Sequence, residues 1–128
     1  MINYERLLKV LLELKERSED GAVILVEGRR DVLSLRKLGI YGKIITISNI
    51  SKAKLVDDLG YCDVIILTDW DEKGEILKRD LVAKLSSWGV VADTSLRKKL
   101  FEVVGNVVTE VEDLADLFFK LQTHPRSL

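Results

Sequence analysis

The chain has 128 residues, of which 47% are hydrophobic and 32% charged, a composition typical of one well-ordered globular domain. Its 20 basic and 21 acidic residues leave a net charge of −1, so total charge encodes no strong nonspecific attraction to nucleic acid. One cysteine excludes an internal disulfide and a multi-cysteine zinc site, and no apolar run approaches the ~20 residues of a membrane span, so we expect a cytoplasmic protein without a membrane partner.

Apolar spacing in the first half of the chain predicts helices that alternate with short strands. Leucines at helical spacing predict a helix over residues 4–17, with Asn3 as its cap. The run "GAVILVEG" predicts a buried strand closed by Gly28, and "RRDVLSLRKLG" predicts a helix that ends at Gly39. The elements that follow are a strand, a short helix and a third strand, over residues 43–48, 51–60 and 63–69.

The second half continues this alternation. A long helix is predicted over residues 72–89, and its inner stripe consists of Ile76, Leu77, Leu81, Leu85 and Trp88. The elements predicted after it are a fourth strand, a helix, a weaker fifth strand at a sheet edge and a closing helix, over residues 90–93, 94–105, 106–111 and 112–122.

Helices alternating with continuously apolar strands indicate an α/β fold with a parallel sheet and helices on both faces. We predict a Rossmann-like three-layer α/β/α sandwich around a central, mainly parallel sheet of four to five strands. The expected organisation is an N-terminal helix packed on the domain (residues 1–19), a single α/β domain (20–122) and a flexible tail (123–128).

Acidic residues follow two of the apolar strands at the point where each strand ends. Asp69 and Asp71 follow the third strand, and Glu27 follows the first. Because the carboxyl ends of parallel strands lie at one edge of the sheet, we expect the three carboxylates to converge there. Gly28 and Gly74 are expected to let the backbone turn tightly beside these acids.

Carboxylate oxygens are ligands that Mg²⁺ prefers, together with water and substrate phosphate. The three acids therefore predict a magnesium site at this edge. A simpler interpretation is that Asp69 and Asp71 only stabilise the start of the next helix through its dipole.

Other polar side chains are expected near the same edge. Asp31 either reaches the edge or pairs with a basic residue on its own helix, and Trp70 is either a core residue or a platform for a base. Four cations are either phosphate contacts or ordinary surface charges, namely Arg29, Arg30, Lys73 and Lys78.

The segments "VILVEGRRDVLSLRKLG" and "DVIILTDWDEKGEILKRDL" resemble the Toprim domain of topoisomerases, bacterial-type primases, certain nucleases and recombination-mediator proteins. The signature of that domain is a Glu after the first strand and an Asp-x-Asp after the third, with a Gly soon afterwards. Here these residues are Glu27, Asp69, Asp71 and Gly74, and the resemblance covers roughly residues 20–110. It implies that the aspartates hold one or two Mg²⁺ ions, for which Mn²⁺ can substitute, and that Glu27 acts as general acid or base or as a further ligand.

Within that family, the chain is similar to small stand-alone proteins of archaeal type and to the Toprim half of a ribosomal-RNA maturase. Trp70 departs from the Pro or Phe often found between the two aspartates. The positions that match the motifs of the maturase half are Glu27, Gly28, Arg29, Asp31, Gly74 and Glu75.

Two functions are consistent with this resemblance. One is a Mg²⁺-dependent enzyme, a nuclease or a primase-like nucleotidyl-transfer enzyme, that acts on RNA or DNA. The alternative is a non-catalytic adaptor that binds nucleic acid or a protein partner in a processing complex. A phosphorylated receiver domain also has a parallel sheet and Mg²⁺-binding acids. It requires two acidic residues after the first strand, but here Glu27 is followed by Gly28, and it requires a lysine after the fifth strand, which residues 106–111 do not contain.

Overall fold

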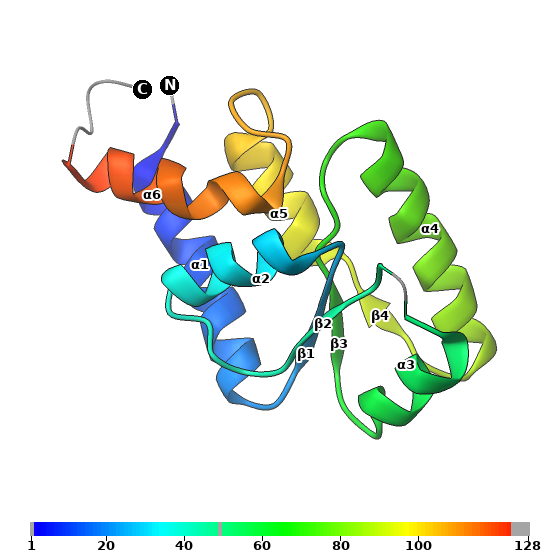
Figure 1. Ribbon diagram of the computed structural model, residues 1–128. Coiled ribbons are helices and arrows are strands. Elements are labelled where there is room, and N and C mark those ends of the chain that lie inside the picture. Colours follow the sequence, from blue (N-terminus) through cyan, green and yellow to red (C-terminus); the bar gives the residue numbers. More distant parts are fainter. Residues whose placement is uncertain (1, 49, 124–128) are drawn as a thin grey trace.

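The computed structural model describes residues 2–48 and 50–123, and its centre is a four-stranded parallel sheet (Figure 1). The strand order is β2-β1-β3-β4, so the chain reverses its direction across the sheet between the neighbouring strands β1 and β3. In sequence order the strands are β1 (Val23–Val26), β2 (Ile44–Thr46), β3 (Val64–Ile66) and β4 (Ala92–Asp93).

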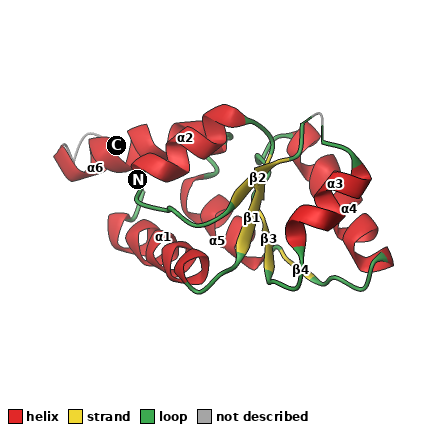
Figure 2. Cartoon of the chain, turned by 60° about the horizontal axis from the view of Figure 1, so that its bottom comes forward, coloured by secondary structure: helices red, strands yellow, loops and turns green. Residues whose placement is uncertain are grey.

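Helices cover both faces of this sheet (Figure 2). One face packs against α1, α2, α5 and α6, and the other packs against α3 and α4. The predicted three-layer α/β/α architecture is therefore confirmed. The helices are α1 (Tyr4–Glu19), α2 (Arg29–Lys37), α3 (Lys52–Leu59), α4 (Glu72–Ser87), α5 (Ser95–Val104) and α6 (Leu114–Thr123), and a short 3-10 turn, η1 (Val111–Asp113), precedes α6.

Alternating side chains of the central strands supply both cores. In β1, Ile24 and Val26 face the core shared with α1, α2, α5 and α6, whereas Val23 and Leu25 face the core shared with α3 and α4. This period of two follows from the pleat of an extended strand. Because helices cover both faces, every residue of β1 and β3 is buried, which explains why their sequences are continuously apolar.

Helix α1 is an integral part of the larger core. Its buried leucines belong to the same apolar cluster as α5 and α6. Two ion pairs also join α1 to its neighbours, Arg17 to Asp93 of β4 at 2.7 Å and Glu13 to Lys99 of α5 at 3.1 Å. As predicted, the Asn3 side chain caps α1 by accepting a hydrogen bond from the backbone of Arg6.

The prediction of a fifth strand over residues 106–111 is wrong. The amides of Val107 and Val108 both donate to the carbonyl of Val104, so the segment turns back on α5 instead of extending along β4. It then crosses the carboxyl edge of the sheet, where Thr109 accepts a hydrogen bond from the backbone of Trp70 at 2.8 Å. Three valines gave the segment strand propensity, but its hydrogen bonds go to a helix and a loop.

Two smaller expectations also differ from the structure. Ile76 was expected on the inner stripe of α4, but its side chain is 49% exposed and Leu81 and Leu85 form the buried part. Thr123, which we expected at the start of the tail, ends α6, and the rest of the expected tail, residues 124–128, lies outside the described residues. None of the helices in the described part of the chain combines the length and apolarity that a membrane span requires.

Candidate functional site

Two of the predicted acids meet at the carboxyl edge of the sheet, between the neighbouring strands β1 and β3. Glu27 is the first residue after β1, and its Oε2 accepts a hydrogen bond from the backbone amide of Asp69 at 2.7 Å. Forty-two positions separate the two residues in sequence. The contact lies where the strand order reverses, which is the position at which open α/β sheets bind their ligands.

The Asp69 carboxylate is half-buried in a negative environment. Its Oδ1 accepts a hydrogen bond from the amide of Val111 at 2.8 Å, which lowers the pKa. Burial, the largest cause, and the charges of Asp31 and Glu27 nevertheless together raise the pKa of Asp69 from 3.8 to about 7. A carboxylate whose charge is disfavoured in this way gains stabilisation from a bound cation.

Asp31 is the third carboxylate of this cluster. It is only 6% exposed, and its Oδ2 accepts a hydrogen bond from the amide of Gly28 at 3.0 Å. Burial raises the pKa of Asp31, and the charges of Glu27 and Glu112 add to that effect. Of the two alternatives that the sequence left open, the structure shows that Asp31 reaches the edge. No ion pair among the described residues neutralises Glu27, Asp31 or Asp69.

Asp71 has a different environment from Asp69. It is exposed at the N-terminus of α4, where its Oδ1 accepts a hydrogen bond from the amide of Gly74 at 2.7 Å. The helix-capping role that the sequence left open is therefore present. Within residues 2–48 and 50–123, no three Asp, Glu, His or Cys side chains are arranged so that they could jointly hold a metal ion.

The two glycines beside the acids behave differently. A Cβ on Gly74 would collide with the carbonyl group of Asp69, so only glycine permits this approach of α4 to the loop after β3. Gly28 does not make the tight turn that we expected. Its backbone is extended, with φ −151° and ψ −178°, and an added Cβ would meet nothing within 4 Å.

The predicted cations surround the edge without contacting the carboxylate cluster. Arg29, Arg30 and Lys73 are exposed, and Arg30 lies 3.8 Å from Glu112. Lys78 lies farther along α4 and is paired with Glu75 at 2.7 Å. Helices α2 and α4 both begin at this edge, so the positive ends of their dipoles also face it.

Arg97 on α5 is a structural part of the site that we did not predict. It is 5% exposed and donates to the carbonyls of Thr68 at 3.0 Å and Asp69 at 2.5 Å. It also donates to Glu75 at 2.8 Å, and hydrogen bonds from Lys78 and Arg97 lower the pKa of Glu75. Arg97 thereby holds the loop that carries the aspartates. The available signal was an arginine beside Leu96 on the apolar side of a predicted helix.

A second acidic group, also missed, comes from the segment that we assigned to a strand. A hydrogen bond with Glu112 raises the pKa of Glu110 to about 7, with further contributions from desolvation and from the charges of Glu112, Asp113 and Asp71. The acidic run "TEVED" was visible in the sequence, but only the crossing of this segment over the sheet edge brings it near Asp71.

The donor chemistry of the edge fits a hard divalent cation. Glu27, Asp31 and Asp69 offer oxygen atoms only, and no ion pair among the described residues compensates their charge, although the three side chains do not form a ready-made ligand cluster there. Asp71 lies two residues farther along the same loop, on the side of Glu110.

Comparisons with known proteins agree with this architecture. The family model of the Toprim domain matches residues 22–103. A UPF0292 protein of Archaeoglobus fulgidus is 36% identical over 121 residues, covering 94% of this chain and 96% of that protein. A UPF0292 protein of Methanosarcina acetivorans is 39% identical over 122 residues, covering 93% and 84%. A solved structure of an Aquifex aeolicus protein superposes with a TM-score of 0.73 at 34% identity, covering 83% of this chain and 95% of that one. Because the family model spans most of the chain and includes Glu27, Asp69 and Asp71, the chain belongs to the Toprim domain family.

Proposed function

We propose that the protein is a Mg²⁺-dependent enzyme of nucleic-acid metabolism that cleaves or transfers a phosphodiester in RNA or DNA. The observation that carries this proposal is the contact between Glu27 and Asp69 at the reversal of strand order, with Asp31 beside them. Membership of the family adds support, since Toprim domains generally bind Mg²⁺ and act on nucleic acids.

In this proposal Asp69 and Asp71 hold the divalent ion, and Glu27 is either a further ligand or the general acid or base. When bound, the ion would stabilise charge on the phosphate and orient the attacking water. Glu27 is well placed for a proton-transfer role because the amide of Asp69 fixes its orientation. Asp69 is uncharged for much of the time near neutral pH, since its pKa is about 7, and it gives up this proton when a cation binds.

The surrounding cations would hold the phosphates of the strand. Arg29 and Lys73 are exposed and form no ion pair within the described part of the chain, so they are free to contact phosphate. Arg30 can leave Glu112, because a 3.8 Å pair with an arginine that is 85% exposed contributes little stability. Lys78 is the weakest candidate of the four, since Glu75 already holds it at 2.7 Å.

A second candidate is a non-catalytic adaptor that binds nucleic acid or a protein of a processing complex. The observation that favours it is Asp71, which is engaged as the cap of α4, together with the lack of a ready-made three-ligand cluster among the described residues. An adaptor needs the edge only as a binding surface, and its carboxylates would not take part in a reaction.

Cleavage and extension assays separate the two candidates. Labelled single-stranded and duplex RNA and DNA are incubated with Mg²⁺ or Mn²⁺, and products are resolved by length. We expect the wild-type protein to act on at least one substrate and Glu27→Gln to be inactive. Glu19→Gln is the matched control, because Glu19 is exposed at the opposite end of the sheet, where α1 ends. Binding without any product, unaffected by Glu27→Gln, would instead establish the adaptor.

A further inference from the structure

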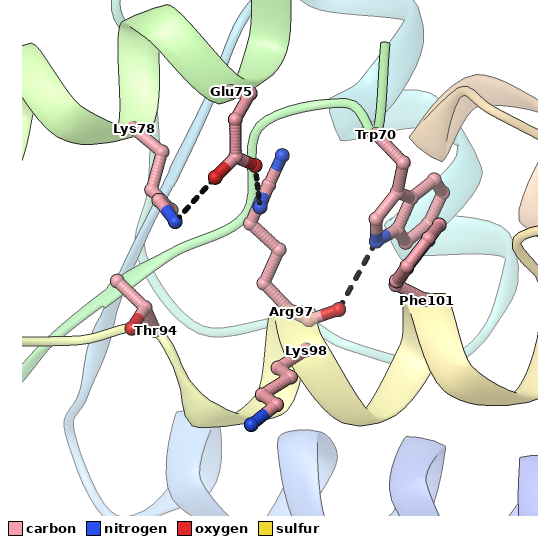
Figure 3. A pocket seen from close by; sticks show the side chains of 7 residues that line it. All are labelled: Trp70, Glu75, Lys78, Thr94, Arg97, Lys98 and Phe101. Atoms are coloured by element: carbon pink, nitrogen blue, oxygen red, sulfur yellow. Dashed lines mark hydrogen bonds and ion pairs between the residues drawn. The ribbon is translucent and has the colours of Figure 1, made fainter. Parts of the chain in front are cut away.

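A pocket of about 460 Å³ opens beside the loop that carries the two aspartates (Figure 3). It lies between the first two turns of α4 and the exposed side of α5. Trp70 and Phe101 supply aromatic surface, and Lys78, Arg97 and Lys98 supply positive charge. Trp70 stands between Asp69 and Asp71 in the sequence, and Arg97 donates to the carbonyl of Asp69, so the pocket adjoins the loop that carries the two aspartates.

The aromatic side of the pocket is fixed by contacts to neighbouring segments. The Trp70 indole donates through Nε1 to the carbonyl of Arg97 at 3.0 Å, and its backbone amide donates to Thr109 at 2.8 Å. Phe101 is 52% exposed. A Cβ at Gly105 would collide with the ring of Phe101, so the glycine makes room for the ring in this position. Trp70 and Phe101 together therefore give one side of the pocket a fixed aromatic surface.

The charge of the pocket is positive, in contrast to the net charge of −1 of the whole chain. Three cations stand against one acid, Glu75. Arg97 and Lys78 are both bonded to Glu75, as the dashed lines in Figure 3 show, and Arg97 is further occupied by backbone carbonyls. Lys98 is exposed, and within the described residues its side chain has neither an ion pair nor a hydrogen bond, so its charge is available to a ligand.

We propose that this pocket binds one unpaired base of a single-stranded nucleic acid, stacked against Phe101 and Trp70, with Lys98 on a phosphate of the same strand. Aromatic surface next to an unpaired cation is the combination that recognises single strands, since each base offers a flat face and each link a negative charge. Bases of a duplex are stacked on one another and cannot enter. The inference rests on the proposed function, because it names the form of nucleic acid that is held beside Asp69 and Asp71.

Fluorescence anisotropy with short labelled strands of RNA and DNA tests the inference, first in EDTA and again with Ca²⁺ to neutralise the carboxylates. We expect Phe101→Ala to weaken binding of the single strand by about tenfold, as loss of one stacked base does, without changing the salt dependence. Lys98→Ala should make the slope of log affinity against log salt shallower by about 0.7, the value for one phosphate contact on a single strand. Phe101→Leu keeps an apolar side chain and should reproduce the loss.

Two variants serve as matched controls. Tyr61→Ala removes an exposed aromatic residue from the opposite edge of the sheet, and Lys120→Ala removes an exposed lysine from α6. If the wild type binds a strand and the Phe101 and Lys98 variants bind it as tightly as the two controls do, the pocket is not the binding site. The proposed function would then still stand. Absence of binding to any strand under both conditions would overturn the proposed function as well. A duplex that shows the same tenfold loss would overturn base stacking.

Discussion

Replacing Asp69 by asparagine should stabilise the metal-free protein, and the gain should grow with pH. The pKa of Asp69 is raised from 3.8 to about 7, so the folded protein disfavours the ionised side chain. Because the folded pKa lies above the unfolded one, the contribution of this carboxyl is fully present below pH 3.8 and is lost as the pH rises through about 7. Asparagine has no charge to lose and retains an oxygen for the amide of Val111.

The shift sets the size of the effect. A pKa raised from 3.8 to about 7 corresponds to on the order of 4 kcal/mol of unfavourable free energy for the ionised form. The measured gain should be smaller, about 1–2 kcal/mol, because Glu27 and Asp31 share the repulsion and relax when one charge is removed.

Urea denaturation in EDTA at a series of pH values between about 4 and about 8 measures this gain, with the free energy of unfolding compared between wild type and Asp69→Asn. Asp80→Asn is the control, since Asp80 is exposed in the middle of α4 and forms no ion pair among the described residues. A difference that stays constant with pH, or a variant that is less stable than wild type at the alkaline end, would refute the reasoning.

Three further predictions concern the scaffold of the site. Arg97→Met should lower the free energy of unfolding by about 3–5 kcal/mol in urea denaturation, because the carbonyls of Thr68 and Asp69 and the carboxylate of Glu75 lose their donor. A loss below about 1 kcal/mol would contradict the role that we assign to Arg97. Gly74→Ala should destabilise strongly by forcing α4 away from Asp69, whereas Gly28→Ala should be nearly neutral, so equal melting temperatures of the two variants would argue against this packing. Lys78 and Arg97 lower the pKa of Glu75, so the stability that this carboxylate contributes is present above the unfolded value of 4.5 and is lost as the pH falls. Glu75→Gln should therefore make the free energy of unfolding less dependent on pH in the acid range, and an unchanged dependence would show that Glu75 is not its source.

The convergence of Glu27 and Asp69 was predictable because parallel topology alone determines it. Apolar strands identified β1 and β3, and right-handed crossovers put their carboxyl ends on one edge. The direct hydrogen bond from the Asp69 amide to the Glu27 side chain is a detail that the sequence did not predict.

The parts that could not be predicted depend on contacts between distant segments. Val107, Val108 and Val111 have strand propensity, yet the amide of Val111 is taken by Asp69 and the segment lies across the sheet edge. Arg97 is bonded to carbonyls of a loop 28 and 29 positions away, and no local pattern encodes such a partner. At Gly28 the local sequence was misleading instead. A glycine beside an acid indicated a tight turn, but the backbone of Gly28 is extended.

Titration calorimetry with Mn²⁺ tests most directly whether the carboxyl edge of this sheet is a divalent-cation site. We predict that the wild-type protein binds Mn²⁺ and releases protons on binding at about pH 7, because the pKa of Asp69 is about 7. The double variant Asp69→Asn/Asp71→Asn should remain folded and show no binding, while Asp80→Asn should bind as the wild type does. An unchanged Mn²⁺ affinity in the folded double variant would contradict the site.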